Sequence, residues 1–279
     1  MCSFRGEPGC VFGWIALLSL VLPFVPAVAA PDDAGIARLV KQLGDDDFDQ
    51  REAASKALTK VGEPALEVLR KAAASSGDVE VRHRAGQLIE AIENDLPYLF
   101  NGKDLTGWVG LKYWSVKDGA IVGDTSPDGV AFNTFLCSKK KYKDFELTFK
   151  VRLKGGTGNS GVQIRSAIFD QIKLAVAGPQ CDIAIGYWGS LYGEALPAVG
   201  MMKAAPKDVV EKVLKKADFN DFYIKCVGKH VTVKLNGATT VDDDFEKMAD
   251  EGIIAWQIHG GGAMEVTFKA IQFKDLSRK

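Results

Sequence analysis

Polar side chains alternate with apolar ones in three short segments whose residue types could do chemistry. In the first segment, Asn159, Gln163 and Arg165 alternate with Val162 and Ile164. Successive side chains of a β-strand point to opposite faces, so this spacing predicts a strand with one polar and one apolar face. The polar face carries amide and guanidinium groups, whereas an ordinary solvent-facing strand would carry Lys, Thr and Glu.

Two further segments repeat this pattern. Gln180 and Asp182 form the polar face of one, and Gln257 and His259 that of the other. A loop after the first of these adds more polar and aromatic side chains: Tyr187, Trp188, Ser190, Tyr192 and Glu194. Such a mixture is typical of a site for a polyhydroxylated ligand. For each segment alone we favour a half-exposed strand whose polar groups meet water, but the three together favour a site.

The surrounding sequence predicts an antiparallel β-sandwich. Residues 145–153 alternate apolar and polar side chains along a continuous run. Residues 222–227 and 231–235, joined by Gly228-Lys229-His230, predict a hairpin. The apolar phase changes between Phe268 and Ile271, which predicts a bulge in the last strand. Many short strands separated by Gly and Asn turns are typical of a sandwich.

One segment among these strands has helical spacing. Residues 206–217 carry Val209, Val210, Val213 and Leu214 on one side of a predicted helix. We expect this helix to cover a sheet edge; the alternative is a lid beside the site.

Residues 31–96 precede the strands and predict a small all-α domain. Its sequence repeats after 31 residues, so that Asp47 and Arg51 recur as Asp78 and Arg82. This repeat resembles HEAT-type helical repeats. A solenoid of so few helices is weak, and we therefore expect the block to pack against the following domain, residues 97–279, or against a protein partner.

Residues 1–30 predict export. Arg5 supplies a positive n-region, Val11 to Val25 an apolar stretch, and Ala27-Val28-Ala29 a cleavage site of small residues. The alternative is an uncleaved membrane anchor, but the apolar run is shorter than the roughly 20 residues that a spanning helix needs. We expect a periplasmic or extracellular protein.

Composition argues against several other functions. The chain has 35 basic and 36 acidic residues and no long basic run, so we expect no nucleic-acid partner. Cys137, Cys181 and Cys226 lack a CxxC spacing and nearby histidines, which disfavours zinc and a disulfide framework. We expect these cysteines to be small buried hydrophobes.

Seven motifs in order carry a family resemblance: residues 99–108, 114–119, 144–147, 159–161 with Arg165, 189–192, 235–237 and 257–260. With them, residues 98–276 resemble the 3-keto-disaccharide hydrolase domain family, which is common in secreted bacterial proteins. The resemblance implies a concanavalin-like jelly roll of two antiparallel sheets. One departure is that the family's usual Glu-Val-Gln run is Gln180-Cys181-Asp182 here, so an amide stands where a carboxylate is expected.

The resemblance implies action on glycosides oxidised to a ketone at C3. The ketone acidifies the C2 proton, a base removes it, the C1 oxygen leaves from the enolate, and water adds back. For this route we predict His259 as the general base, because imidazole titrates near neutral pH. Asp182 would orient the substrate or act as the alternative base, and Arg165 with Asn159 and Gln163 would donate to the enolate.

Other roles follow from the same resemblance. Ordinary glycoside hydrolysis needs two carboxylates, for which Asp182 and Glu194 are the candidates. Asp182, Gln180 and His259 together could hold a divalent cation, although no dense ligand cluster demands a metal. The other predicted substrate-binding residues are Gln180, Gln257, Trp114, Trp188, Tyr187, Ser190 and Tyr192.

Two alternatives to an enzyme stay open. One is a carbohydrate-binding module of the same jelly-roll fold, in which the Trp and Tyr side chains are platforms for sugar rings. The other is a secreted scaffold whose helical repeats recruit an enzyme. A titratable imidazole at His259 favours the enzyme, unless that side chain only caps a turn beside Gly260.

Overall fold

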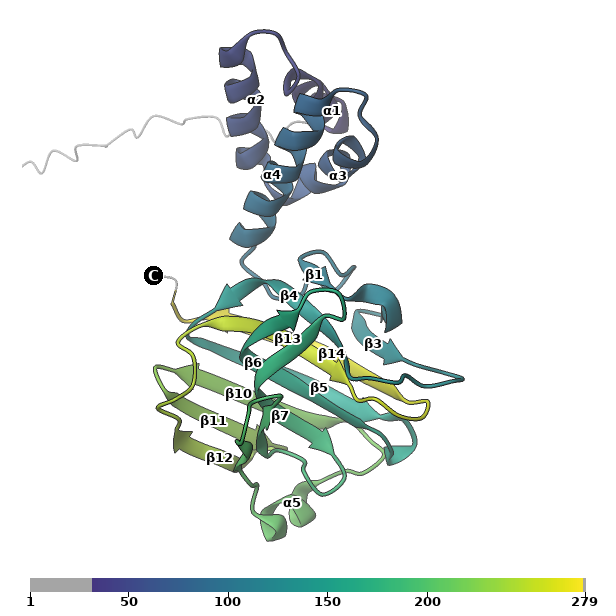
Figure 1. Cartoon of the computed structure of the whole chain (residues 1–279), viewed down its shortest axis with the longest axis vertical. Helices are drawn as coiled ribbons and strands as arrows, with labels where there is room; N and C mark the ends of the chain where they lie inside the picture. Colours follow the sequence, from purple (N-terminus) through teal and green to yellow (C-terminus); the bar gives the residue numbers. More distant parts are fainter. Residues whose placement is uncertain (1–31, 278–279) are drawn as a thin grey trace, which may run out of the picture.

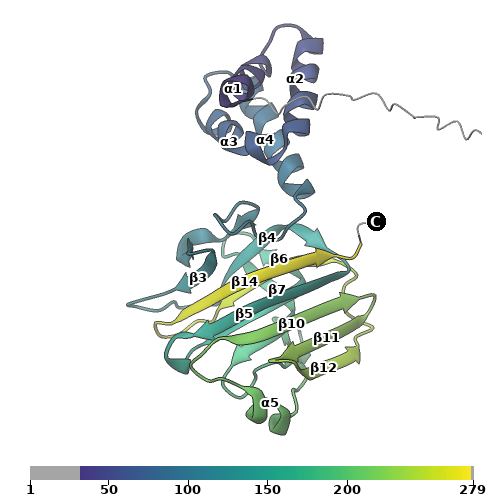
Figure 2. The same ribbon diagram turned by 180° about the vertical axis from the view of Figure 1, so that it is seen from behind.

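Two antiparallel sheets of seven strands each form a sandwich, as expected from the alternating pattern. The computed structural model describes residues 32–277, and the predicted signal segment at residues 1–30 lies outside the described residues. Sheet A contains, in order, β1 (Trp108–Val109), β4 (Thr134–Tyr142), β13 (Gly252–Ile258), β6 (Asn159–Asp170), β7 (Ala175–Ala184), β8 (Leu191–Glu194) and β9 (Gly200–Lys203). Sheet B contains β12 (Ala238–Asp244), β11 (His230–Leu235), β10 (Asn220–Val227), β5 (Phe145–Leu153), β14 (Glu265–Asp275), β3 (Ala120–Asp124) and β2 (Trp114–Lys117). Figures 1 and 2 show the two layers from opposite sides.

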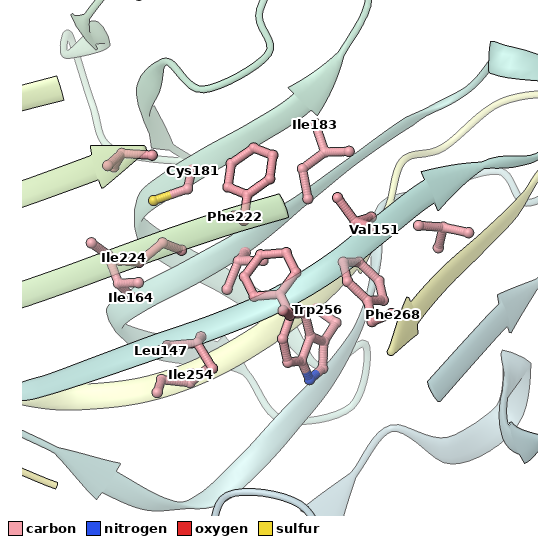
Figure 3. Packing of buried hydrophobic residues seen from close by; sticks show 14 of the residues in the cluster. Leu147, Val151, Ile164, Cys181, Ile183, Phe222, Ile224, Ile254, Trp256 and Phe268 are labelled. Atoms are coloured by element: carbon pink, nitrogen blue, oxygen red, sulfur yellow. The ribbon is translucent and has the colours of Figure 1, made fainter. Parts of the chain in front are cut away.

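An aromatic core holds the sheets together. Trp256 of β13 lies 4.5 Å from Phe268 of β14 and 5.2 Å from Phe149 of β5, measured between ring centroids. Phe222 of β10 stacks on Phe149 at 5.3 Å. Figure 3 shows the Phe222, Trp256 and Phe268 rings between strands of both sheets. Burying each such side chain stabilises the fold by about 1.5–3 kcal/mol, so the inner faces of the strands are strongly specified.

Local predictions for the strands are confirmed. β10 and β11 pair as a hairpin from Phe222–Leu235 to Val227–His230. The partners of β14 shift between Lys269 and Gln272, which is the expected bulge. Cys137, Cys181 and Cys226 are free and buried, and burial raises the pKa of each thiol.

The predicted helix at 206–217 is shorter than expected. α5 (Lys207–Val213) packs beside β12, the edge strand of sheet B. It ends because the Asn220 side chain accepts a hydrogen bond from the Lys215 N–H at 2.9 Å and donates one to the Lys215 carbonyl at 2.9 Å. These two bonds hold the backbone there outside helical geometry. The other short helices are η1 (Glu63–Ala65), η2 (Leu111–Tyr113) and η3 (Lys154–Gly156).

The sequence repeat forms the same local structure twice. The N-terminal helices are α1 (Asp33–Gln42), α2 (Phe48–Val61), α3 (Leu66–Ser75) and α4 (Val79–Asp95). Asp47 caps α2 and Asp78 caps α4, each accepting backbone N–H groups of the first turn. Arg51 donates to the Asp45 carbonyl at 2.7 Å, and Arg82 donates to the Ser76 carbonyl at 2.5 Å. The repeated Asp and Arg therefore secure the loop before each helix.

A buried carboxylate joins the helices to the sandwich. Glu93 of α4 is 5% exposed and pairs with Arg70 of α3 at 2.8 Å and with Lys139 of β4 at 2.6 Å. Arg70 also donates to the Thr106 hydroxyl at 3.0 Å. The block lies at the end of the sandwich opposite α5 (Figure 1). No helix among residues 32–277 is long and apolar enough to cross a membrane.

We predict that Glu93→Gln lowers the free energy of unfolding by about 1–3 kcal/mol, because two cations lose their shared buried partner. Denaturant unfolding of the full chain measures this. Glu90→Gln, an exposed change three residues earlier on α4, is the control and should have no effect. Equal midpoints for the Glu93 variant and the wild type would show that the ion pairs do not stabilise the junction.

Candidate functional site

A polar pocket of about 340 Å³ lies on the outer face of sheet A, which is turned away from sheet B. Strands β6, β7 and β8 supply part of its lining, because their apolar residues face the core and their alternate residues therefore face outward. Asn133, Tyr187 and His259 come from loops beside these strands and after β13. It contains seven residues that the sequence singled out: Asn159, Gln180, Asp182, Tyr187, Tyr192, Glu194 and His259. The structure thus brings these seven residues together in one pocket, while their roles stay predictions.

A chain of buried hydrogen bonds ends at Asp182. The Ser166 hydroxyl donates to Gln163 Oε1 at 2.7 Å, Gln163 Nε2 donates to Gln180 Oε1 at 2.8 Å, and Gln180 Nε2 donates to Asp182 Oδ1 at 2.8 Å. All four residues are buried. This arrangement determines which end of each amide faces which neighbour, so that an N–H donor points at the Asp182 carboxyl.

Glycine at position 161 makes room for this chain. Gly161 pairs with Asp182 across β6 and β7, and a Cβ there would lie 2.4 Å from Gln180 Cδ and 2.5 Å from its Cγ. A larger residue would displace Gln180 from Asp182. The Gln180 amide can donate to an ionised Asp182, whereas the ionised glutamate that the resemblance leads us to expect at this position could not.

The pKa of Asp182 is raised to about 7, chiefly by burial; the hydrogen bond from Gln180 acts to lower this pKa, and the nearby Glu194 charge acts to raise it. A carboxyl in this range exchanges its proton at neutral pH. It is therefore a stronger base than an ordinary carboxylate.

His259 lies at the exposed rim of the pocket. Its Nδ1 is 2.7 Å from the Gly260 carbonyl oxygen, so Nδ1 carries the hydrogen and Nε2 is the acceptor of the neutral ring. Asn133 connects this rim to β8, because its Nδ2 donates to Glu194 Oε1 at 2.9 Å and its Oδ1 accepts from the Gly260 N–H at 2.8 Å. Sequence reasoning missed Asn133, which lies in a loop without any periodic pattern.

The prediction that Arg165 faces the pocket is wrong. The pairing of β6 shifts register between Gln163 and Ala167, and Arg165 has a positive φ of 45°. The side chain is fully buried and pairs with Asp144 at 2.9 Å. It also donates to the carbonyls of Lys143, at 2.7 Å, and of Gly228. Arg165 therefore stabilises turns between strands and does not reach the pocket. Its side chain points away because the bulge breaks the alternation that the sequence suggested.

Four other predicted binding residues also lie elsewhere. Trp114 and Trp188 are buried in the core, against Phe268 and Phe222 respectively, so neither is a platform in this pocket. The Ser190 hydroxyl is buried and accepts from the Ala205 N–H at 3.0 Å. Gln163 is a buried support for Gln180 rather than a direct contact for a ligand.

Gln257 is on the expected face but is fully buried. It pairs across the sheet with Phe135 of β4 on one side and with Gly161 of β6 on the other, and it does not line the pocket. Neither atom of its amide has a hydrogen-bond partner within residues 32–277. It therefore contributes to the packing beneath the pocket and not to its wall.

A second, more apolar cleft of about 730 Å³ adjoins the pocket. The two share Asn133, Glu194, Ala195 and His259. The cleft's aromatic lining comes from Tyr113, Phe132, Phe135 and Phe169. None of these four was predicted, because three lie at or beyond strand ends, where alternation gives no signal.

The donors in the pocket do not fit the divalent cation considered from the sequence. Gln180 turns its oxygen toward Gln163 and its nitrogen toward Asp182, so the amide offers no ligand atom beside the carboxyl. Within the described part of the chain, no three His, Cys, Asp or Glu side chains are grouped as metal ligands.

This fold and pocket define a jelly-roll domain that is carbohydrate-active. A family model described as the 3-keto-alpha-glucoside-1,2-lyase-like domain matches residues 97–274, and the chain belongs to this family. The resemblance identified from the sequence motifs is thereby confirmed.

Similar solved structures include a Parabacteroides distasonis protein provisionally described as a glycosyl hydrolase, with a TM-score of 0.48, 24% identity, and coverage of 64% of this chain and 92% of that one. Another is the carbohydrate-binding module CBM66 of Bacillus subtilis, with a TM-score of 0.46, 15% identity, and coverage of 64% and 99%. No curated protein matches the sequence significantly.

The pKa of Asp182 predicts a specific pH dependence of stability. An unfolded aspartate loses its proton near pH 4, whereas Asp182 in the folded protein keeps it to about pH 7. Between these values the folded state holds more protons, so the contribution of Asp182 to stability falls as the pH rises through this window. Above about pH 7 it stays at its low value.

We predict a pH-dependent difference between Asp182→Asn and the wild type in the free energy of unfolding. The value for the variant minus that for the wild type should be about 2–3 kcal/mol more positive at pH 8 than at pH 5, because asparagine cannot ionise. Its oxygen can still accept from Gln180. Denaturant unfolding at both pH values measures the difference. Asp128→Asn, an exposed change outside both pockets, is the control. A pH-independent difference for Asp182→Asn would mean that this carboxyl has an ordinary pKa.

Proposed function

We propose that the polar pocket binds a 3-keto-glycoside and that the domain cleaves its glycosidic bond by elimination and hydration. The observation that carries this proposal is a buried carboxyl with a pKa of about 7 in the same pocket as an imidazole, a second carboxylate and two tyrosines. Membership of the 3-keto-alpha-glucoside-1,2-lyase-like family supports the substrate class.

The reaction requires a base at C2 and an acid at the glycosidic oxygen. The base takes the C2 proton, and the electron pair of that bond forms an enolate with its charge on the C3 oxygen. The enolate re-forms the ketone as the C1–O bond breaks, and the leaving oxygen takes a proton from the acid. Water then adds its hydroxyl at C1 and a proton at C2, so the net change is hydrolysis.

We assign the base to Asp182. The sequence-based hypothesis preferred His259 because an aspartate would need a raised pKa to remove a weakly acidic C–H proton. Asp182 meets that condition, since burial raises its pKa to about 7. The hydrogen bond from Gln180 also holds the carboxyl in one orientation, which favours proton transfer in a defined direction.

We assign proton transfer at the glycosidic oxygen to His259, with Glu194 as the second group at the same rim. Both residues line the pocket and the adjoining cleft. A glycosidic bond that joins a sugar in the pocket to a leaving group in the cleft therefore lies beside His259 and Glu194. Donors for the enolate oxygen are the Asn159 amide and the phenols of Tyr187 and Tyr192, which replace the predicted role of Arg165.

We predict that Asp182→Asn and His259→Ala each slow cleavage of a methyl 3-keto-glucoside by about 100- to 10,000-fold, the usual loss for a general acid or base. The two variants should differ in deuterium exchange at C2, followed by NMR in heavy water. Asp182→Asn should abolish this exchange, because no base removes the proton. His259→Ala should keep it, because only departure of the leaving group is impaired.

His230→Ala is the matched control, since His230 is an exposed histidine on sheet B, bonded to Asp242 and Asp244. If His259→Ala abolishes exchange and Asp182→Asn keeps it, the imidazole is the base and our assignment is reversed. Loss of activity with a chelator would show that a divalent cation takes part in the reaction, as considered from the sequence. If no keto-glycoside reacts but unmodified oligosaccharides bind, the domain is a carbohydrate-binding module.

Export to the periplasm or the exterior, and a protein partner for the helical block, remain predictions from the sequence. We expect the mature chain to begin near Ala30, after the Ala27-Val28-Ala29 site. Intact-mass measurement of the protein purified from the exported fraction checks this. Retention of Met1 on the soluble protein would contradict it.

A further inference from the structure

The apolar cleft beside the pocket is built from segments far apart in the sequence. Phe132 comes from the loop before β4, Phe169 from the end of β6 and Val176 from β7. The cleft opens directly into the polar pocket at His259 and Glu194. A ligand that occupies both would therefore pass the groups to which we assign proton transfer at the glycosidic oxygen.

Two phenylalanines of the cleft are unusually exposed. Phe132 is 71% exposed and Phe169 is 64% exposed. Exposed apolar rings that line a cavity offer area that a ligand can remove from water, at about 25 cal/mol for each Å². Phenylalanine also lacks the polar group with which Tyr or Trp would bind sugar hydroxyls.

Two polar side chains of the cleft, Asn133 and Asp170, are engaged by bonds within the protein. Both ends of the Asn133 amide are bonded, to Glu194 and to Gly260. Asp170 Oδ1 accepts from the N–H groups of Ile172 and Lys173. The Lys173 ammonium lies 5.6 Å from the centre of the Phe132 ring. A second sugar would bury hydroxyls against the Phe132 and Phe169 rings, which offer them no hydrogen-bond partner, at a cost that an apolar ring does not have.

We infer that this cleft is the leaving-group site and that it takes an aromatic aglycone. The inference rests on the proposed function, in which the sugar occupies the polar pocket. When the C1–O bond breaks, its electron pair stays on the leaving oxygen, which takes a proton at the junction formed by His259 and Glu194. The departing alcohol then lies between Phe132 and Phe169, and a disaccharide is the poorer substrate.

The test compares benzyl and methyl 3-keto-glucosides with the full chain. Benzyl alcohol and methanol have similar acidity, so the ratio of their kcat/KM values reports binding of the ring. We expect benzyl to be favoured by about 10-fold or more, from burial of one phenyl ring. Phe132→Ala and Phe169→Ala should each lower this ratio at least threefold. Ile172→Ala is the control and should leave this ratio unchanged. Ile172 is 96% exposed in the turn between β6 and β7, close in sequence to Phe169, but it does not line the cleft.

A ratio near one, or a ratio that both phenylalanine variants leave unchanged, would overturn the inference. So would a 3-keto-disaccharide that reacts faster than the benzyl compound. If no keto-glycoside reacts, the proposed function fails, and equilibrium binding of benzyl and methyl glucosides to the same variants then decides about the cleft. Tighter binding of the benzyl compound that depends on Phe132 and Phe169 supports the apolar site, whereas equal binding refutes it.

Discussion

A chain of three hydrogen bonds ends at the Asp182 carboxyl, and the chemistry available to the pocket depends on this chain. Because Ser166, Gln163 and Gln180 are buried, each of their polar groups needs a partner, and the chain gives each of them one. The same burial that requires these bonds also raises the pKa of Asp182 to about 7. One arrangement thus determines both the orientation of the carboxyl and its strength as a base.

The aromatic core supports this arrangement from the other side of sheet A. Trp256 packs between Phe149 and Phe268, and it lies next to Gln257 on β13. A register slip of one residue would bring the Gln257 amide into the core between the sheets and move the Trp256 ring away from its aromatic partners, at a cost of several kcal/mol. The inner packing therefore determines which residues of β13, β6 and β7 reach the outer face, where Gly161 leaves space for Gln180.

The site is asymmetric in a way that suits its proposed reaction. Asp182 lies buried in a polar pocket, whereas His259 and Glu194 stand where that pocket meets an apolar cleft. Asn133 ties Glu194 to the backbone beside His259, so the junction is held by side chains from β8 and from two loops. The helical block joins the sandwich through Glu93 and Lys139, which line neither pocket.

Local periodicity alone determined the sandwich, the hairpin, the bulge in β14 and the outward direction of Gln180, Asp182 and His259. It did so because the strand repeat of two is a property of each segment by itself. Only the tertiary structure decided the rest of the site. Arg165 left the pocket because a bulge in β6 reversed its face. Trp114 and Trp188 turned inward because Phe268 and Phe222 offered apolar partners in the core. Asn133 and Phe132 entered the site from a loop, where position depends on contacts between distant segments and not on any repeat in the sequence.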